Sequence, residues 1–140
     1  MSAVPAGPHV IVNPPELLPP IGFSHAVVSA PGHLVHLGGQ TGHAADGSLP
    51  DGLVAQFDGA CRNLVVALDA AGAAPRQLTA LQIYVTDMAG YRAALDDIGA
   101  AYRRHLGRHY PAVALLGVAG LFDPDAVVEL VATAVVPGDD

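Results

Sequence analysis

The sequence predicts an α+β domain in which two helices pack on one face of a mixed β-sheet. Apolar residues recur at spacings of three and four within residues 53–71 and 87–106, as in amphipathic helices. Short apolar and β-branched runs surround these segments and give the order β-β-α-β-α-β-β. The 140 residues contain no internal repeat, so we expect a Pro-rich N-terminal lead-in over residues 1–20 and a single domain over residues 21–137.

The N-terminal segment contains six prolines within its first 20 residues, so it is predicted to be extended, with one edge strand at His9–Val12. Two strand-like segments follow, His25–Ser29 and His33–Leu37, and they flank the turn-forming pair Pro31–Gly32. The sequence therefore predicts a β-hairpin between these two strands.

The first helix is predicted over Leu53–Ala71, after a glycine-rich loop over residues 41–52. Gly72 follows it and is a typical C-terminal stop. The apolar face of this helix consists of Phe57, Ala60, Cys61, Leu64, Val65 and Leu68.

The second helix is predicted to begin at Asp87, a favourable N-cap, and to end near Leu106. A β-branched, apolar strand over Thr79–Thr86 precedes it. Two further strands, Ala112–Ala119 and Ala126–Val136, are nearly continuous apolar runs. That pattern is typical of strands that are buried on both faces.

The composition limits the possible functions. Hydrophobic residues make up 51% of the chain and charged residues only 14%, against roughly 25% in average domains. We therefore expect part of the apolar surface to be covered by a second copy of the chain. All six basic residues are arginines, which excludes a lysine Schiff base and a P-loop. The net charge of −7 argues against a nucleic-acid partner.

Cys61 is the only cysteine, which excludes an intrachain disulfide and fits a reducing compartment. The N-terminus lacks the positively charged region of a signal peptide. No apolar run approaches the roughly 18 residues of a membrane span. The expected location is therefore cytoplasmic, with no membrane partner.

Glu129 is the first candidate for chemistry, because it interrupts the run AVVELVATAVV, which is otherwise apolar apart from Thr133. A carboxylate buried there must be paired, hydrogen-bonded or neutral. Such a group could activate water or move a proton. An outward-facing position on a half-exposed strand is the alternative.

Other residue patterns indicate neither a metal site nor a cofactor. His33 and His36 are three apart on a strand and point to opposite faces, and no carboxylate ligand accompanies His105 and His109. We expect Cys61 to be a buried hydrophobic residue. No G-x-S-x-G or G-x-G-x-x-G motif occurs in the required context.

Three arginines, Arg103, Arg104 and Arg108, gather at the end of the second predicted helix. Cations at this position complement the helix dipole, which is the interpretation we favour. An anion site shared with His105 and His109 is the alternative.

Four segments resemble the RidA/YjgF family of imine and enamine deaminases: GFSHAVVSAPGHLVHLGGQTG, AGAAPRQLTALQIYVTDM, HYPAVALLGVAGL and VELVATAVV. The resemblance extends from about Gly22 to Val136, and Glu129 stands where the last strand of the family carries a glutamate. It implies a fold similar to that of chorismate mutase and homotrimers with clefts between subunits. It also implies hydrolysis of an imine or enamine to ammonia and a keto acid.

The chain departs from this family at polar positions of the implied site. The family motif Pro-Ala-Arg-Ser reads Pro111-Ala112-Val113-Ala114, so Val113 replaces the arginine that would bind a substrate carboxylate. The family's tyrosine is Phe23, its cysteine-containing position falls on Leu115, and its Ser-Gly-Gln motif begins at Gly38. These changes favour a neutral, apolar or cationic ligand over a small carboxylate.

Two functions follow from the resemblance and its departures. One is hydrolytic deamination or related proton transfer on a neutral or apolar metabolite, with Glu129 as the catalytic residue at the base of the cleft. The other is a non-catalytic homotrimer that binds a small molecule between subunits. Arg108 or His109 would restore an anion site by reaching Glu129. The predicted substrate-binding residues are Phe23, Gly38, Val113 and Leu115.

Overall fold

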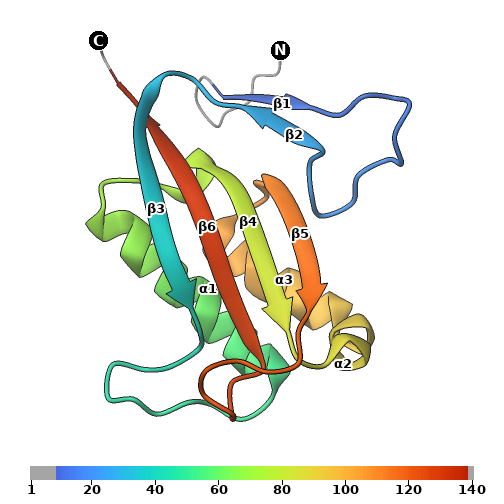
Figure 1. Ribbon diagram of the computed structural model, residues 1–140, viewed down its shortest axis with the longest axis vertical. Coiled ribbons are helices and arrows are strands. Elements are labelled where there is room, and N and C mark those ends of the chain that lie inside the picture. The colour runs from blue at the N-terminus through green and yellow to red at the C-terminus, as the bar shows by residue number, and fades with distance from the viewer. Residues whose placement is uncertain (1–8, 139–140) are drawn as a thin grey trace.

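Four strands form the main sheet in the order β3-β6-β4-β5, and helices cover one of its faces (Figure 1). The computed structural model describes residues 9–138. β3 runs antiparallel to β6, β6 antiparallel to β4, and β5 parallel to β4. The predicted α+β class with a mixed sheet is therefore confirmed. The four strands are β3 (Gly32–Gln40), β4 (Leu78–Val85), β5 (Ala112–Gly117) and β6 (Val128–Pro137).

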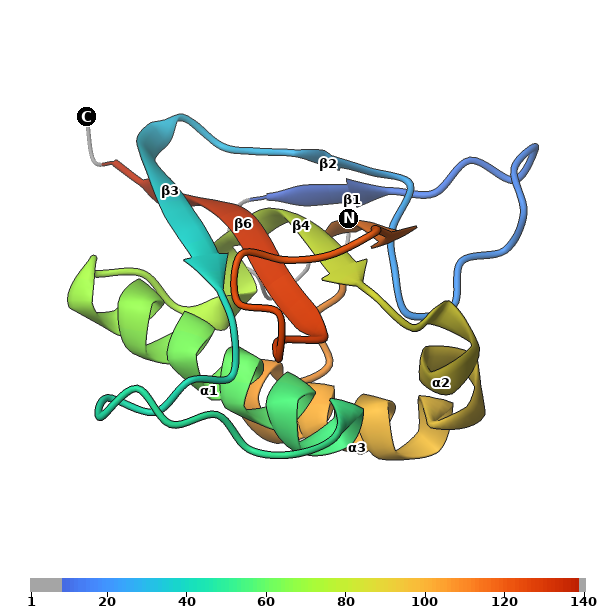
Figure 2. The ribbon, with the colours of Figure 1, turned by 60° about the horizontal axis from the view of Figure 1, so that its bottom comes forward.

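The helices α1 (Leu53–Ala70) and α3 (Leu95–Leu106) form a layer against the sheet (Figure 2). Gly72 follows α1 with a φ of 80° and ends it as predicted. A short 3₁₀ turn over Pro75–Gln77 then leads into β4. No helix within residues 9–138 is long and apolar enough to cross a membrane. The α1 side chains with at most 1% exposure are Phe57, Ala60, Cys61, Leu64 and Leu68, all on the predicted apolar face.

The second predicted helix is two helices, because the chain turns at Ala94 between α2 (Met88–Ala93) and α3. Asp87 caps α2 as predicted, since its Oδ1 accepts the Gly90 N–H at 2.9 Å. Ala94 leaves helical geometry with a φ of −111° and a ψ of 21°. With this turn Tyr91 lies in the core, 7% exposed, while α3 follows the sheet.

The predicted hairpin is wrong. β2 (Ala26–Val28) pairs antiparallel with β1 (Val10–Val12), whereas β3 joins the main sheet beside β6. The β1–β2 ribbon lies across one end of that sheet (Figure 1). Pro31 and Gly32 therefore lead from one sheet to the other and do not close a hairpin.

A buried histidine, His9, explains why the N-terminal strand takes this place. Its ring is 2% exposed and bridges two backbone groups. Nδ1 accepts the Ala30 N–H at 3.0 Å, and Nε2 lies 2.9 Å from the Val135 carbonyl oxygen. These contacts fix the start of β1 beside the end of β2 and against β6. The sequence pattern carries no sign of them.

β5 is an exposed edge strand, which differs from the buried strand predicted over Ala112–Ala119. Leu115 is 38% exposed and Leu116 is 40% exposed. Apolar side chains point to both faces of β5, and this is the sequence pattern of a strand that is covered on both sides. Within residues 9–138, Ala112 and Val113 are half-buried, whereas Ala114 to Gly117 are exposed on both faces.

Candidate functional site

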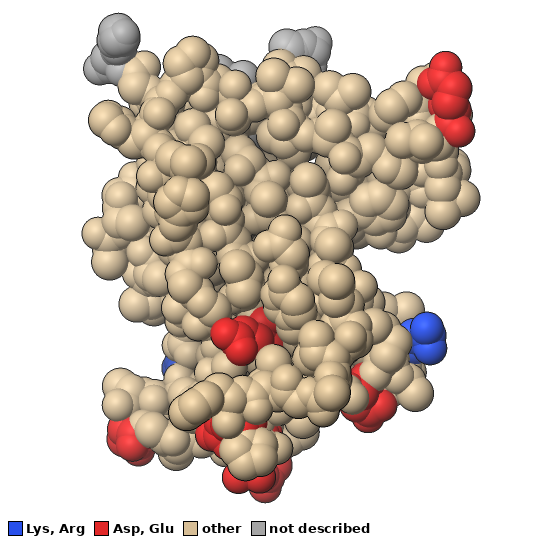
Figure 3. Space-filling model, viewed as in Figure 1, with Lys and Arg blue, Asp and Glu red and all other residues tan. Residues whose placement is uncertain are grey.

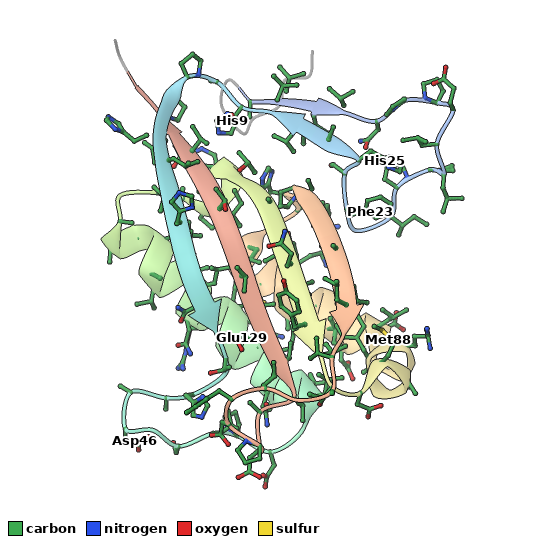
Figure 4. The ribbon with its side chains drawn as sticks, viewed as in Figure 1. His9, Phe23, His25, Asp46, Met88 and Glu129 are labelled. Carbon is green, nitrogen blue, oxygen red and sulfur yellow. The ribbon has the colours of Figure 1, made fainter. Side chains whose placement is uncertain are left out.

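The face of the main sheet that points away from the helices, here called the outer face, carries Glu129 (Figure 4). Glu129 is the only charged residue, histidines aside, in the six strands of residues 9–138. Buried and half-buried residues alternate along β6, with Val128 and Leu130 toward the helices. Figure 3 shows this face as mainly uncharged, with acidic atoms where Figure 4 labels Glu129.

Two neighbouring strands confine the Glu129 carboxylate. Tyr84 of β4 lies opposite it in register. On the other side β3 has an irregularity between Leu37 and Gln40. Within it, a Cβ atom added to Gly39 would lie 1.8 Å from Glu129 Oε2, so only a glycine leaves room for the carboxylate. Within residues 9–138, no ion pair neutralises this half-buried group.

Gly38, predicted to bind substrate, precedes Gly39 on the outer face. A Cβ atom added to Gly38 would meet nothing within 4 Å, so the space beside this residue is open. Gly38 therefore lies on the same part of the outer face as the half-buried Glu129, whose carboxylate is a group that can accept a proton.

A second site lies on the opposite side of the sheet, in a cavity of about 600 Å³ between the sheet and the helices α2 and α3. We call it the helix-side pocket. It contains three of the predicted substrate-binding residues, Phe23, Val113 and Leu115. Arg103 is the only charged residue in its lining. The other lining side chains are Ile21, Phe57, Ile83, Tyr91, Leu95, Ile98, Tyr102 and Tyr110.

The N-terminal segment is fixed at the mouth of this pocket. Ser24 donates its N–H to the Pro111 carbonyl at 2.9 Å and its hydroxyl to the Tyr110 carbonyl at 2.6 Å. Gly22 has a φ of 76°, a conformation that favours glycine. The Phe23 ring packs edge-on against His25, with ring centroids 5.1 Å apart. Phe23 is thereby held next to the start of β5.

A single chain does not bring Glu129 and the helix-side pocket together. Val113 and Leu115 pair with residues of β4 that face the helices, whereas Glu129 pairs with Tyr84 on the outer face. Because side chains alternate along a strand, the sheet lies between the two groups. The structure therefore places Phe23 with Val113 and Leu115, and places Gly38 with Glu129.

A groove of about 940 Å³ adjoins the helix-side pocket, and we call it the arginine groove. Arg76, Arg103, Arg104 and Arg108 line it, and its lining contains no carboxylate. Arg104 forms an ion pair with Asp58. The arginine cluster noted in the sequence thus borders a cavity, as the anion-site alternative requires.

The two histidines of this region have separate partners. His105 Nε2 lies 2.9 Å from Asp58 Oδ1, and His109 Nε2 lies 2.8 Å from the Leu78 carbonyl oxygen. Neither His109 nor Arg108 forms an ion pair with Glu129. Among residues 9–138 no group of three His, Cys, Asp or Glu side chains could hold a metal ion.

His109 is expected to make folding stability fall in mild acid. Burial lowers the pKa of the His109 imidazole below the ordinary histidine value of 6.5. The unfolded chain then binds a proton at His109 more readily than the folded protein does. The contribution of His109 to folding stability is therefore complete above pH 6.5 and is lost as pH falls from 6.5 to the lower pKa of the folded protein. Urea unfolding at pH 7.5 and 5.5 should show a smaller pH effect in His109→Gln than in the wild type. An equal pH effect in both proteins would exclude His109 as its source.

Cys61 is buried within α1, as predicted, with 0% exposure. Burial raises the pKa of its thiol, and the nearby Asp58 raises it further. A thiol held in its neutral form is a poor nucleophile. This residue therefore belongs to the core.

The sequence did not reveal a hydrogen-bonded chain at the end of the sheet near Glu129. His43 Nδ1 lies 2.6 Å from Thr41 Oγ1, and His43 Nε2 lies 2.8 Å from Asp123 Oδ2. Asn63 of α1 donates to the carbonyls of Thr41 and His43, both at 2.8 Å. These hydrogen bonds join the loop after β3 to the loop after β5. His43 and Asp123 are 80 positions apart in sequence, so no local motif indicates their contact.

The chain matches a family sequence profile described as Endoribonuclease L-PSP over residues 16–136. No curated protein matches it.

Solved structures with the same fold include YyfB from Yersinia pestis, a protein of the conserved Rid family. It is 34% identical with a TM-score of 0.80, and the match covers 91% of this chain and 98% of that one. A putative endoribonuclease from Thermotoga maritima is 26% identical, with a TM-score of 0.66 over 90% and 93% of the two chains. Rv2704 from Mycobacterium tuberculosis, of the YjgF/YER057c/UK114 family, is 28% identical, with a TM-score of 0.61 over 91% and 99%.

Proposed function

Since the chain belongs to the RidA/YjgF family, whose sequence profile is described as Endoribonuclease L-PSP, we propose that it is a RidA-like enzyme that processes a small molecule. The proposed reaction is hydrolysis of a neutral or apolar imine or enamine. A water oxygen bonds to the imine carbon, the C=N bond is broken, and the nitrogen leaves as ammonia. Glu129 passes both water protons to the nitrogen in turn, one as the water adds and one as the hydroxyl of the resulting carbinolamine becomes a carbonyl, so that a carbonyl compound and ammonia leave.

The observation that carries this proposal is the helix-side pocket. A cavity of about 600 Å³ with mainly apolar walls suits a ligand with a sizeable apolar body. Val113 offers no charge to a small carboxylate, and losing a bidentate arginine contact of this kind costs about 2–5 kcal/mol. The pocket thus supports a substrate larger and less polar than a short imino acid.

The proposal also assigns the site to a boundary between copies in a homotrimer. The pocket of one subunit and the outer face of its neighbour would then form one cleft, with Glu129 supplied across the boundary. Exposed apolar side chains support such cover: Leu34 on β3 is 57% exposed, and the β5 edge exposes Leu116. Glu129, the isolated charge on the outer face, would be the polar group of this cleft.

Sedimentation is expected to give about three times the chain mass of 14.2 kDa at micromolar concentration. The physical reason is the uncovered apolar edge and outer face of the sheet. Equilibrium runs at several concentrations measure this mass directly. A clean monomer would remove the shared cleft from the proposal.

Turnover is tested with imines generated in the assay by an amine oxidase from apolar amines, or by an amino acid oxidase from apolar amino acids. The expected result is ammonia release faster than in buffer and in proportion to protein concentration. Heat-denatured protein is the control. No acceleration across the panel would contradict the enzymatic function.

The second candidate is a non-catalytic small-molecule-binding homotrimer. The observation that favours it is the separation of Glu129 from the pocket within one chain. Ligand binding in the pocket without turnover of any imine in the panel would select this function.

A further inference from the structure

We propose that Arg103 makes the helix-side pocket a site for molecules with an apolar body and a carboxylate at one end. The inference rests on the proposed function and changes one part of it: the substrate keeps a largely apolar body, but it is an anion and not a neutral molecule. Arg103 is then a specificity-determining residue, supplied by α3.

The position of Arg103 is the first support. It lines both the helix-side pocket and the arginine groove, so its side chain stands where the two cavities meet. Phe23 and Tyr110 are also shared by the two cavities. A ligand that enters the pocket with its apolar end leading would leave its other end at this junction.

Gly99, one helical turn before Arg103, is the second support. A Cβ atom added at Gly99 would lie 3.0 Å from Arg103 Nη1, so the guanidinium lies over the bare backbone of this glycine. Gly99 itself lines the pocket. Glycine is unfavourable inside a helix, and here its missing side chain gives the guanidinium room against the pocket wall.

The charge balance is the third support. Within residues 9–138 Arg103 takes part in no ion pair, whereas the neighbouring Arg104 is bound to Asp58. Four arginines line the adjoining groove with no carboxylate among them, on a chain whose net charge is −7. A positive cavity on an acidic protein attracts an anion and orients it, and a free guanidinium can bind a carboxylate in bidentate fashion.

The rest of the pocket determines the size of the ligand. Its volume of about 600 Å³ lies within the range of roughly 300–1,000 Å³ of small-molecule sites. Ile83, Leu95 and Ile98 give it aliphatic walls. An aromatic or branched body fills such a space, whereas a two- or three-carbon acid would not.

The test compares two probes with the same phenylpropyl body, 3-phenylpropionate, which ends in a carboxylate, and 3-phenylpropan-1-ol, which ends in a neutral hydroxyl, by calorimetry on the protein as purified. Wild-type protein is expected to bind the acid about tenfold more tightly than the alcohol, since a charge-assisted contact at a partly exposed site is worth about that much. The difference should shrink at high salt.

Arg103→Met keeps the length of the side chain without its charge, and should bring the two affinities together while leaving that of the alcohol unchanged. Arg103→Lys should restore part of the preference. Arg92→Met is the matched control, because Arg92 is exposed on α2 and lines neither cavity. It should keep the wild-type preference.

The outcomes separate this inference from the proposed function. Equal wild-type affinities for the two probes, or an unchanged preference in Arg103→Met, would overturn the role of Arg103 and leave the pocket as a ligand site. If Arg103→Met binds neither probe, the Arg103 side chain has a packing role, and the inference is overturned as well. If the wild type binds neither probe, the inference fails, and the turnover of imines described above decides the proposed function by itself.

Discussion

Replacing Glu129 with glutamine is expected to lower the rate of imine hydrolysis by about 10²- to 10⁴-fold, the usual contribution of a general acid–base group. Glutamine has nearly the same shape, so the close packing against Gly39 is retained. The amide, however, neither takes a proton from water nor delivers one to the leaving nitrogen. The loss should therefore appear in kcat, with KM little changed.

Glu16→Gln is the matched control for this measurement. Glu16 is the only other glutamate, and it is exposed in the segment before β2. Its substitution should leave kcat at the wild-type value. Both variants should keep the wild-type sedimentation mass and thermal midpoint. A Glu129→Gln protein as fast as the wild type would remove Glu129 from the mechanism.

Mixed oligomers test whether Glu129 acts across a subunit boundary. Leu115→Trp blocks the helix-side pocket and is expected to be inactive alone, as is Glu129→Gln. A cyclic trimer that contains both kinds of subunit always has one boundary with an intact pocket and an intact Glu129, so about one site in three becomes active. Recovery of activity on mixing supports the shared cleft. No recovery would remove the shared cleft from the proposal.

The fold was largely predictable from the sequence because the spacing of apolar residues along each segment indicates the helices and strands of its two main layers. The i, i+3, i+4 pattern from Phe57 to Leu68 identifies the buried face of α1. The hairpin prediction failed because His9, a polar residue in a Pro-rich segment, makes long-range backbone contacts. Periodicity describes one element at a time and carries no information about such contacts.

The candidate site was less predictable, for a similar reason. The residues matched to the family motif were identified singly, and the side of the sheet on which each lies depends on strand register. Val113 and Glu129 both lie on strands, yet their registers with β4 put them on opposite faces. For Arg103, the sequence indicates only a cation near the end of a helix. Its place beside Gly99 and the pocket required the three-dimensional structure.

Shortening Leu64 to alanine is expected to lower the free energy of unfolding by about 2–5 kcal/mol. Leu64 is 0% exposed in the middle of α1, where the helix packs on α3 and on the sheet. Alanine removes apolar contacts and leaves a cavity that a two-layer core closes only in part.

Val66→Ala, on the exposed side of the same helix at 62% exposure, should change the free energy of unfolding by less than about 0.5 kcal/mol. Urea unfolding at one fixed protein concentration measures both values, because association of subunits would add a concentration-dependent contribution. Equal losses in the two variants would mean that cover by a partner subunit, and not the helix–sheet interface alone, buries α1.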